Sequence, residues 1–170
     1  MSRLTRRDLV RSAVGGAAGL VLGGISRAFA QEFYSRRPGG LGPARGARVV
    51  VVGGGWGGVT AARHLRRARA DAEVVLVEQR PLFMSCPLSN LYLAGARPLD
   101  FFVFDYLNVV RDGVYFVNER AVEVDREHGR VVTTGGAIEY DYLVLSPGIE
   151  YIYEAIEGYP EVRHLMPVAF

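Results

Sequence analysis

The sequence contains no lysine and a single cysteine, Cys86. All 20 basic side chains are therefore arginines, a compositional bias that decides nothing about function. A lone cysteine cannot form a disulfide within the chain, so a small disulfide-stapled fold is excluded. The three histidines have no partners at the spacing of metal ligands, and we predict no metal site.

The chain also has little net charge outside its first thirty residues. Those residues contain five Arg and one Asp, whereas the remaining chain has 15 Arg and 17 acidic residues. A nearly neutral protein gives no electrostatic basis for binding nucleic acid, so we predict none. The length of 170 residues and the 49% hydrophobic content suit an ordinary soluble domain with a sizeable core.

The basic start of the chain resembles a twin-arginine (Tat) export signal. Paired arginines at 6–7 precede an uncharged apolar run of about thirteen residues, and the small residues Ala28 and Ala30 then suit a signal peptidase. The run is shorter than the roughly 20 residues of a membrane span, although an N-terminal membrane anchor is the alternative. We expect a twin-arginine signal peptide over 1–30, the Tat export machinery as a partner and a periplasmic location.

The rest of the chain alternates buried strands with a helix. Residues 31–47, rich in Gly, Pro and Arg, predict a flexible leader. Apolar runs over 48–52 and 73–78 flank a helical apolar spacing over 58–70, which predicts one βαβ unit. The further predicted elements are a loop over 79–98, a helix over 99–111, strands over 114–117 and 142–146, and an antiparallel meander over 120–125, 130–134 and 137–140.

A glycine-rich turn joins the first strand to the helix as G-x-G-x-x-G. Gly53 permits the sharp turn, Gly55 lets the backbone approach a pyrophosphate, and Gly58 lets the helix pack closely on the strand. Glu78 ends the second strand, twenty residues after Gly58, where a carboxylate can accept hydrogen bonds from ribose hydroxyls. The combination predicts dinucleotide binding, with a purely structural βαβ unit as the alternative.

The segment after the meander favours FAD over NAD. In flavoproteins with two dinucleotide-binding domains, a meander leads into a strand that ends near Ala-Thr-Gly beside the FAD, and residues 140–148 resemble that motif. The strand end here is Ser146-Pro147-Gly148, in which Pro147 replaces the threonine and removes one hydrogen-bond donor. We therefore predict FAD as the cofactor.

Three further segments extend this resemblance to one family. Residues 85–90 (Ser-Cys-Pro-Leu-Ser-Asn), 146–150 (Ser-Pro-Gly-Ile-Glu) and 156–159 (Ile-Glu-Gly-Tyr) are similar to the flavoprotein subunit of flavocytochrome c sulfide dehydrogenase, a relative of sulfide:quinone oxidoreductases. The resemblance implies an α/β fold of the pyridine nucleotide-disulfide oxidoreductase superfamily. That fold is a partial Rossmann-like FAD-binding domain with a βαβ unit and an antiparallel β-meander, of which residues 48–170 would be the incomplete N-terminal part.

The resemblance also implies roles for individual residues. Ala121 and Val122 correspond to a strand that presents its backbone to adenine. Cys86 matches a cysteine that can bond covalently to the flavin 8α-methyl, chemistry that suits a soft thiolate nucleophile; a buried, inert thiol is the alternative. The predicted cofactor-binding residues are Gly53, Gly55, Trp56, Gly58, Glu78, Gln79, Cys86, Ala121, Val122, Ser146, Pro147 and Gly148.

The function implied by the resemblance is the oxidation of sulfide, with electrons passing through FAD to a cytochrome c subunit. The family performs the sulfide chemistry at a redox-active disulfide whose cysteines lie further along than this chain extends, so we predict no catalytic residue here. We expect residues 31–170 to be an inactive fragment that does not turn over sulfide alone. Two alternatives remain: another exported FAD-dependent quinone or NADH oxidoreductase, and a non-catalytic FAD-binding remnant.

Overall fold

The computed structural model describes residues 41–44, 46–162 and 164–165, so the predicted signal peptide lies outside the described residues. The strands are β1 (Arg48–Val52), β2 (Glu73–Val77), β3 (Leu82–Met84), β4 (Val103–Asp105), β5 (Tyr115–Val117), β6 (Ala121–Asp125), β7 (Arg130–Thr133), β8 (Gly136–Glu139) and β9 (Tyr142–Leu145). The helices are α3 (Trp56–Ala68), α4 (Asn90–Leu93), α5 (Leu107–Arg111) and α6 (Tyr159–Val162), with 3₁₀ turns η2 (Leu99–Phe102) and η3 (Tyr153–Ala155).

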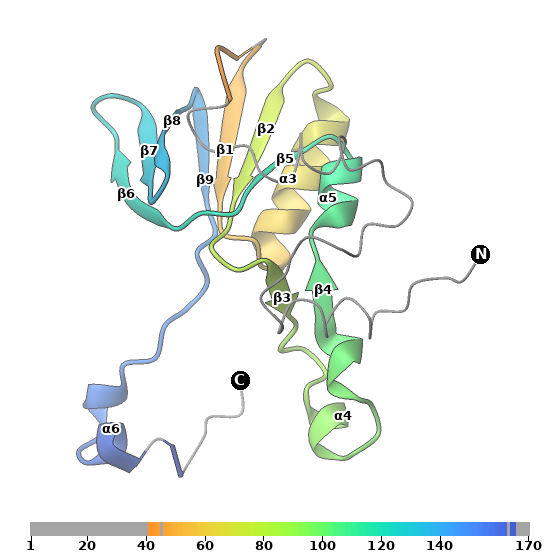
Figure 1. Ribbon diagram of the computed structural model, residues 1–170, viewed down its shortest axis with the longest axis vertical. Coiled ribbons are helices and arrows are strands. Elements are labelled where there is room, and N and C mark those ends of the chain that lie inside the picture. The colour runs from red at the N-terminus through yellow and green to blue at the C-terminus, as the bar shows by residue number, and fades with distance from the viewer. Residues whose placement is uncertain (1–40, 45, 163, 166–170) are drawn as a thin grey trace.

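A four-stranded parallel sheet forms the centre of the fold, in the order β5-β2-β1-β9 (Figure 1). Val50 on β1 lies opposite Val75 on β2 and Leu143 on β9. Runs of Val and Leu bury both faces of β1 and β2, as parallel strands covered on both sides require. The predicted βαβ unit is therefore confirmed.

Helices α3 and α5 cover one face of this sheet. The core on that side contains Val49, Val51, Val74 and Leu76 from the strands, with Ala62 from α3. Helix α3 begins two residues earlier than the apolar spacing predicted, directly after the glycine turn. Helix α5 is tied to it by the residue that follows α5, Asp112, whose carboxylate accepts hydrogen bonds from Arg63 and Arg67 of α3. The Arg63 hydrogen bond is the main reason why the pKa of Asp112 falls below its usual range.

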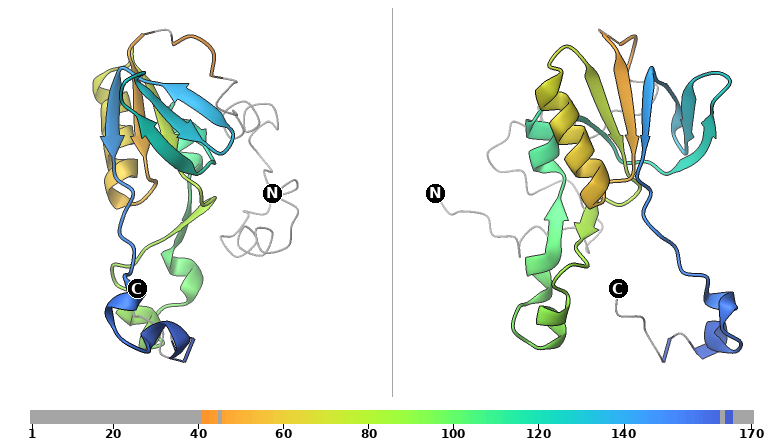
Figure 2. Two further views of the ribbon diagram at one scale, coloured as in Figure 1. Left: turned by 90° about the vertical axis from the view of Figure 1, so that its left-hand side faces the viewer. Right: turned by 180° about the vertical axis from the view of Figure 1, so that it is seen from behind.

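The antiparallel meander β6-β7-β8 covers the other face, as Figure 2 shows. Successive side chains of a strand point to opposite faces of the sheet, so Val50 and Val75 point away from α3. They pack with Val131 and Ile138 of the meander. Leu41 is buried in the same cluster, so the last part of the predicted leader packs against the domain. The predicted meander is confirmed, and none of its strand ends differs from the prediction by more than one residue.

The segment between β2 and β5 differs from the sequence prediction. Residues 79–98 contain β3 and α4 rather than loop alone, and residues 99–111 contain η2, β4 and the short helix α5 rather than one helix. The predicted helix over 99–111 is therefore wrong. Phe104, in the aromatic and β-branched stretch, pairs across an antiparallel ribbon with Phe83, and such side chains favour strands over helices. Among the described residues, every helix is too short or too polar to cross a bilayer.

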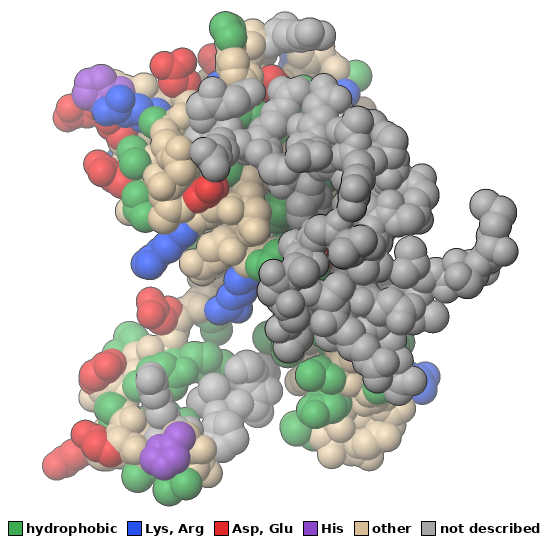
Figure 3. Space-filling model, viewed as in Figure 1, with side chains coloured by type: hydrophobic (Ala, Val, Ile, Leu, Met, Phe, Trp, Pro, Cys, Tyr) green, Lys and Arg blue, Asp and Glu red, His purple; other side chains and the backbone are tan. Residues whose placement is uncertain are grey.

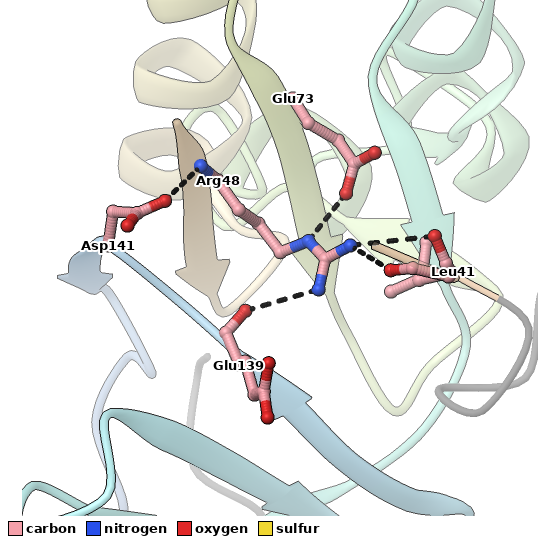
Figure 4. Close-up of polar contacts among 6 residues, drawn as sticks. Leu41, Arg48, Glu73, Glu139 and Asp141 are labelled. Atoms are coloured by element: carbon pink, nitrogen blue, oxygen red, sulfur yellow. Dashed lines mark hydrogen bonds and ion pairs between the residues drawn. The ribbon is translucent and has the colours of Figure 1, made fainter. Parts of the chain in front are cut away.

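The buried residue Arg48 lies at the amino-terminal edge of the parallel sheet, where its side chain joins several segments (Figure 4). Its Nε donates to Glu73 at 2.5 Å, and Nη2 donates to the Gly42 carbonyl at 2.6 Å. The remaining amino group, Nη1, donates to the Glu139 carbonyl at 3.5 Å, while the Arg48 backbone N–H donates to Asp141 at 2.6 Å. Arg48 therefore joins the end of the leader, two parallel strands and the end of the meander in one polar cluster.

Arg48→Met should lower the free energy of unfolding by about 3 kcal/mol, because Glu73 would keep a buried charge without its partner. Arg69→Met is the matched control, because Arg69 and its partner Asp71 have side chains 65% and 70% exposed, and the loss of an exposed ion pair should change the stability far less. Urea denaturation followed by circular dichroism measures both. Equal losses in the two variants would contradict a buried, stabilising Arg48 cluster.

Candidate cofactor site at the glycine turn

The turn between β1 and α3 is shaped by two close backbone approaches. Gly53 has φ of 101°, donates its N–H to the Val77 carbonyl at 2.9 Å, and has a carbonyl that approaches Gly58. A Cβ on Gly53 would lie 2.0 Å from the Ser146 carbonyl oxygen, and a Cβ on Gly58 would lie 1.8 Å from the Gly53 carbonyl oxygen. Both positions require glycine for the fold itself, independently of any ligand.

Gly55 differs from these two glycines. Its φ is −74°, and a Cβ built there meets nothing nearer than the Phe83 ring, at 3.8 Å. It caps α3 without a side-chain hydrogen bond, and the first turn of this 13-residue helix has no acidic residue. The helix start therefore offers backbone N–H groups and a partial positive charge beside a position that a side chain would fill. This arrangement fits a diphosphate.

Glu78 lies against the same turn. Its Oε2 accepts the Gly54 N–H at 2.7 Å and its Oε1 accepts the Arg80 N–H at 2.8 Å, so the half-buried carboxylate is held by two backbone groups. Asn118 donates to the Glu78 carbonyl at 2.8 Å and supports the backbone at this point. Each carboxylate oxygen can still accept a further hydrogen bond, as a ribose hydroxyl would require. Gln79, the next residue, is exposed.

The end of β9 completes the site from the other side. Ser146 donates its backbone N–H to the Val52 carbonyl at 2.8 Å, which extends the pairing of β9 with β1 by one step. A Cβ on Gly57 would lie 2.7 Å from the Ser146 hydroxyl oxygen, so this hydroxyl sits beside the first turn of α3. Pro147 and Gly148 are exposed beyond it. The structure thus brings the glycine turn, Glu78 and Ser146 together at the carboxyl-terminal edge of the sheet.

Tyr106 is a part of the site that the sequence reasoning missed. Its ring is 2% exposed and stacks on Phe116 at 4.5 Å, and its hydroxyl donates to the Gly54 carbonyl at 3.0 Å. Gly54 is consequently held by Glu78 through its N–H and by Tyr106 through its carbonyl. The available sequence signal was a tyrosine at the end of an aromatic run, and the wrong helix prediction over 99–111 gave this tyrosine no role.

Cys86 lies on the connection that follows β3, and its side chain is exposed. The preceding residue, Ser85, is buried and donates its N–H to the Phe102 carbonyl at 2.9 Å, while the Cys86 carbonyl accepts the Ser89 N–H at 3.0 Å. Leu88 adopts a left-handed φ of 68°, which is rare for a residue with a side chain. The alternative of a buried thiol does not apply, because this thiol faces solvent.

The remaining predicted residues are divided between the turn and the meander. Trp56 is the first residue of α3, 57% exposed, and its ring contacts Phe83 and Phe104. Ala121 and Val122 lie on β6, at a register shift between residues 121 and 123, with Val122 exposed. Across the described part of the chain, no cluster of three or more His, Cys, Asp or Glu could hold a metal ion.

Comparison with known proteins identifies relatives of similar sequence. A sulfide:quinone oxidoreductase from Mus musculus is 35% identical over 66% of this chain and 25% of its own length. The sulfide dehydrogenase [flavocytochrome c] flavoprotein chain of Chlorobaculum thiosulfatiphilum is 51% identical over 43 residues, which are 25% of this chain and 90% of that sequence.

A solved structure shares the fold as well. The sulfide:quinone oxidoreductase of Aquifex aeolicus superposes with a TM-score of 0.59 at 32% identity, covering 63% of this chain and 25% of that one. The chain spans about a quarter of the length of the mouse and A. aeolicus proteins. Residues 47–168 match the family described as pyridine nucleotide-disulphide oxidoreductase. The predicted fold class is thereby confirmed, and the chain belongs to the pyridine nucleotide-disulphide oxidoreductase family.

Proposed function

We propose that this chain binds FAD at the glycine turn and forms the N-terminal part of the FAD-binding domain of an exported enzyme that oxidises sulfide. The observation that carries the proposal is the meeting of three groups at one edge of the sheet: the bare start of α3, the Glu78 carboxylate and the Ser146 hydroxyl. The helix start suits a diphosphate and the carboxylate suits a ribose. Bound FAD would supply the redox chemistry of the reaction.

The chain's own residues would divide the binding of FAD among them. The amides around Gly55 would hold the diphosphate, and Glu78 with the neighbouring Gln79 would hold the adenosine ribose. Adenine would lie against the backbone of Ala121 and Val122 on β6. Trp56, Gly53, Gly58 and Ser146-Pro147-Gly148 would border the diphosphate and the flavin side of the cofactor.

The proposed substrate is sulfide, and the proposed acceptor is a cytochrome c subunit. The printed names of the relatives support the first, since the mouse, A. aeolicus and C. thiosulfatiphilum proteins all carry sulfide in theirs. The C. thiosulfatiphilum chain supports the second, because its name identifies it as part of a flavocytochrome c. The sulfide chemistry itself would belong to cysteines in a longer polypeptide, because this chain contains only Cys86.

A quinone acceptor is the second candidate. The two sulfide:quinone relatives match 66% of this chain, whereas the flavocytochrome c relative matches 25% of it, at higher identity. Type II NADH:quinone oxidoreductases match at 25% and 27% identity over 65% of the chain.

Gly55→Ala should separate FAD binding from folding. A methyl group fits at this position in the folded chain, so the loss of stability should not exceed about 1 kcal/mol. The same methyl would keep the diphosphate from the backbone and weaken FAD binding by about tenfold, which corresponds to about 1.4 kcal/mol. Gly58→Ala is the contrast, because its methyl would meet the Gly53 carbonyl and should destabilise the fold by about 2 kcal/mol. Fluorescence titration with FAD, alongside thermal melts, would refute the proposal if wild type and Gly55→Ala bound FAD equally.

Cys86 would form a thioether with the flavin 8α-carbon. Its formation removes the thiol proton and one methyl hydrogen and leaves two electrons on the flavin, which dissolved oxygen can take up. After incubation with FAD and acid precipitation, wild-type protein should retain flavin and Cys86→Ala should release all of it, although both bind FAD before the acid step. If both proteins release their flavin in acid, the linkage is disproved while FAD binding stands.

Export and acceptor can be tested in one experiment on the whole polypeptide made in a bacterium. The signal proposed for residues 1–30 predicts that sulfide-dependent reduction of added cytochrome c appears in the periplasmic fraction. Replacing Arg6 and Arg7 together by Lys should move this activity to the cytoplasm. Reduction of a quinone analogue without reduction of cytochrome c would instead establish the second candidate. Sulfide-dependent activity from residues 31–170 alone would overturn the placement of the redox cysteines outside this chain.

A further inference from the structure

Two phenylalanines of the antiparallel ribbon face the tryptophan at the start of α3. Phe83 on β3 lies directly opposite Phe104 on β4. The Phe83 ring meets Trp56 edge-on, with centroids 5.9 Å apart and planes at 89°, and the Phe104 ring meets it at 6.5 Å and 62°. The three rings, called the aromatic contact below, thus join the ribbon to the first residue of α3.

The ribbon is also attached to the glycine turn beside Trp56. The Phe83 ring lies 3.8 Å from the position of a Cβ on Gly55. The residue directly after β4, Tyr106, donates its hydroxyl to the Gly54 carbonyl. The ribbon is therefore attached to the turn where the diphosphate of FAD is proposed to bind, through Phe83 of β3 and through the residue that follows β4.

The segment carried by this ribbon contains Cys86. The hydrogen bond from the Ser85 N–H to the Phe102 carbonyl continues the pairing of β3 with β4 by one step, so Cys86 follows the last paired residue. Beyond it the segment exposes the hydrophobic side chains Leu88, Tyr92, Leu93, Leu99 and Phe101. Figure 3 shows hydrophobic side chains at the surface in this part of the molecule. Figures 1 and 2 show the ribbon and α4 extending away from the carboxyl-terminal edge of the sheet.

We propose that Trp56, Phe83 and Phe104 are positioning residues that hold the segment 82–105, and with it Cys86, in a fixed place relative to the diphosphate-binding turn. The placement of the segment does not depend on FAD. Its consequence rests on the proposed function: when the diphosphate of FAD occupies the turn, Cys86 would face the flavin. The three rings act through placement and take no part in the chemistry. Their contact energy is of the order found for aromatic pairs.

The chain contains one tryptophan and one cysteine, which form a natural pair for measuring this placement. A dansyl group attached to Cys86 accepts energy from Trp56, and time-resolved emission of the full chain without FAD reports the distribution of distances between them. Wild type should give one narrow distribution, and Phe83→Leu and Phe104→Leu should each broaden it. Phe101→Leu is the matched control, since this exposed ring lies on the same segment and pairs with Phe102. Unchanged distributions in folded Phe83→Leu and Phe104→Leu would overturn the proposal.

A second measurement uses FAD. In wild type, bound FAD should slow or abolish the reaction of Cys86 with a thiol reagent. Phe104→Leu should bind FAD within about threefold of wild type, because Phe104 is not among the residues proposed to bind FAD, but it should lose about threefold to tenfold of that protection, in line with the strength of the aromatic contact removed. Full protection in Phe104→Leu would overturn the proposal. If wild type binds no FAD, the proposed function fails, while the distance measurement without FAD still decides the positioning role.

Discussion

The site depends on how closely two backbone segments approach each other at the carboxyl-terminal edge of the sheet. The turn after β1 passes the end of β9 at a separation that leaves no room for a side chain on Gly53, and the start of α3 presses on the same turn at Gly58. The helix that follows this turn starts at a glycine cap with no side-chain hydrogen bond and no acidic residue in its first turn, so no side chain of that turn neutralises the helix start. Tight packing and an anion-binding surface are here two results of one constraint.

Two side chains hold the turn in this shape before any ligand arrives. Gly54 donates its N–H to Glu78 and accepts at its carbonyl from Tyr106, so both of its polar groups are bound by side chains from other parts of the chain, one just after β2 and one just after β4. Tyr106 is itself fixed by its stacking on Phe116 in the core. A turn whose shape is set by buried groups loses little conformational freedom on binding, which favours affinity.

The parts of the fold set by local pattern could be predicted from the sequence, and those set by contacts between distant residues could not. The valine runs, the glycine spacing and the paired turns around 128–129 and 135–136 each indicate structure within a few residues, and the sheet, the turn and the meander follow. The helix prediction for residues 99–111 was wrong because Phe104 joins a strand only through its pairing with Phe83, twenty-one residues away. The role of Tyr106 was hidden for the same reason, since its partner Gly54 is 52 residues distant.

The two edges of the parallel sheet carry opposite kinds of polar structure. At the amino-terminal edge, Arg48 uses its guanidinium on Glu73 and on carbonyls of the leader and meander, so the charge is matched by groups of the chain itself. At the carboxyl-terminal edge, helix amides and a carboxylate with spare acceptor capacity face outward beside backbone that only glycine permits. The strands that carry this edge are secured by burial and pairing at the other. Both edges belong to the same four strands, and an anionic ligand at the second edge would give the start of α3 the negative partner that its first turn does not contain.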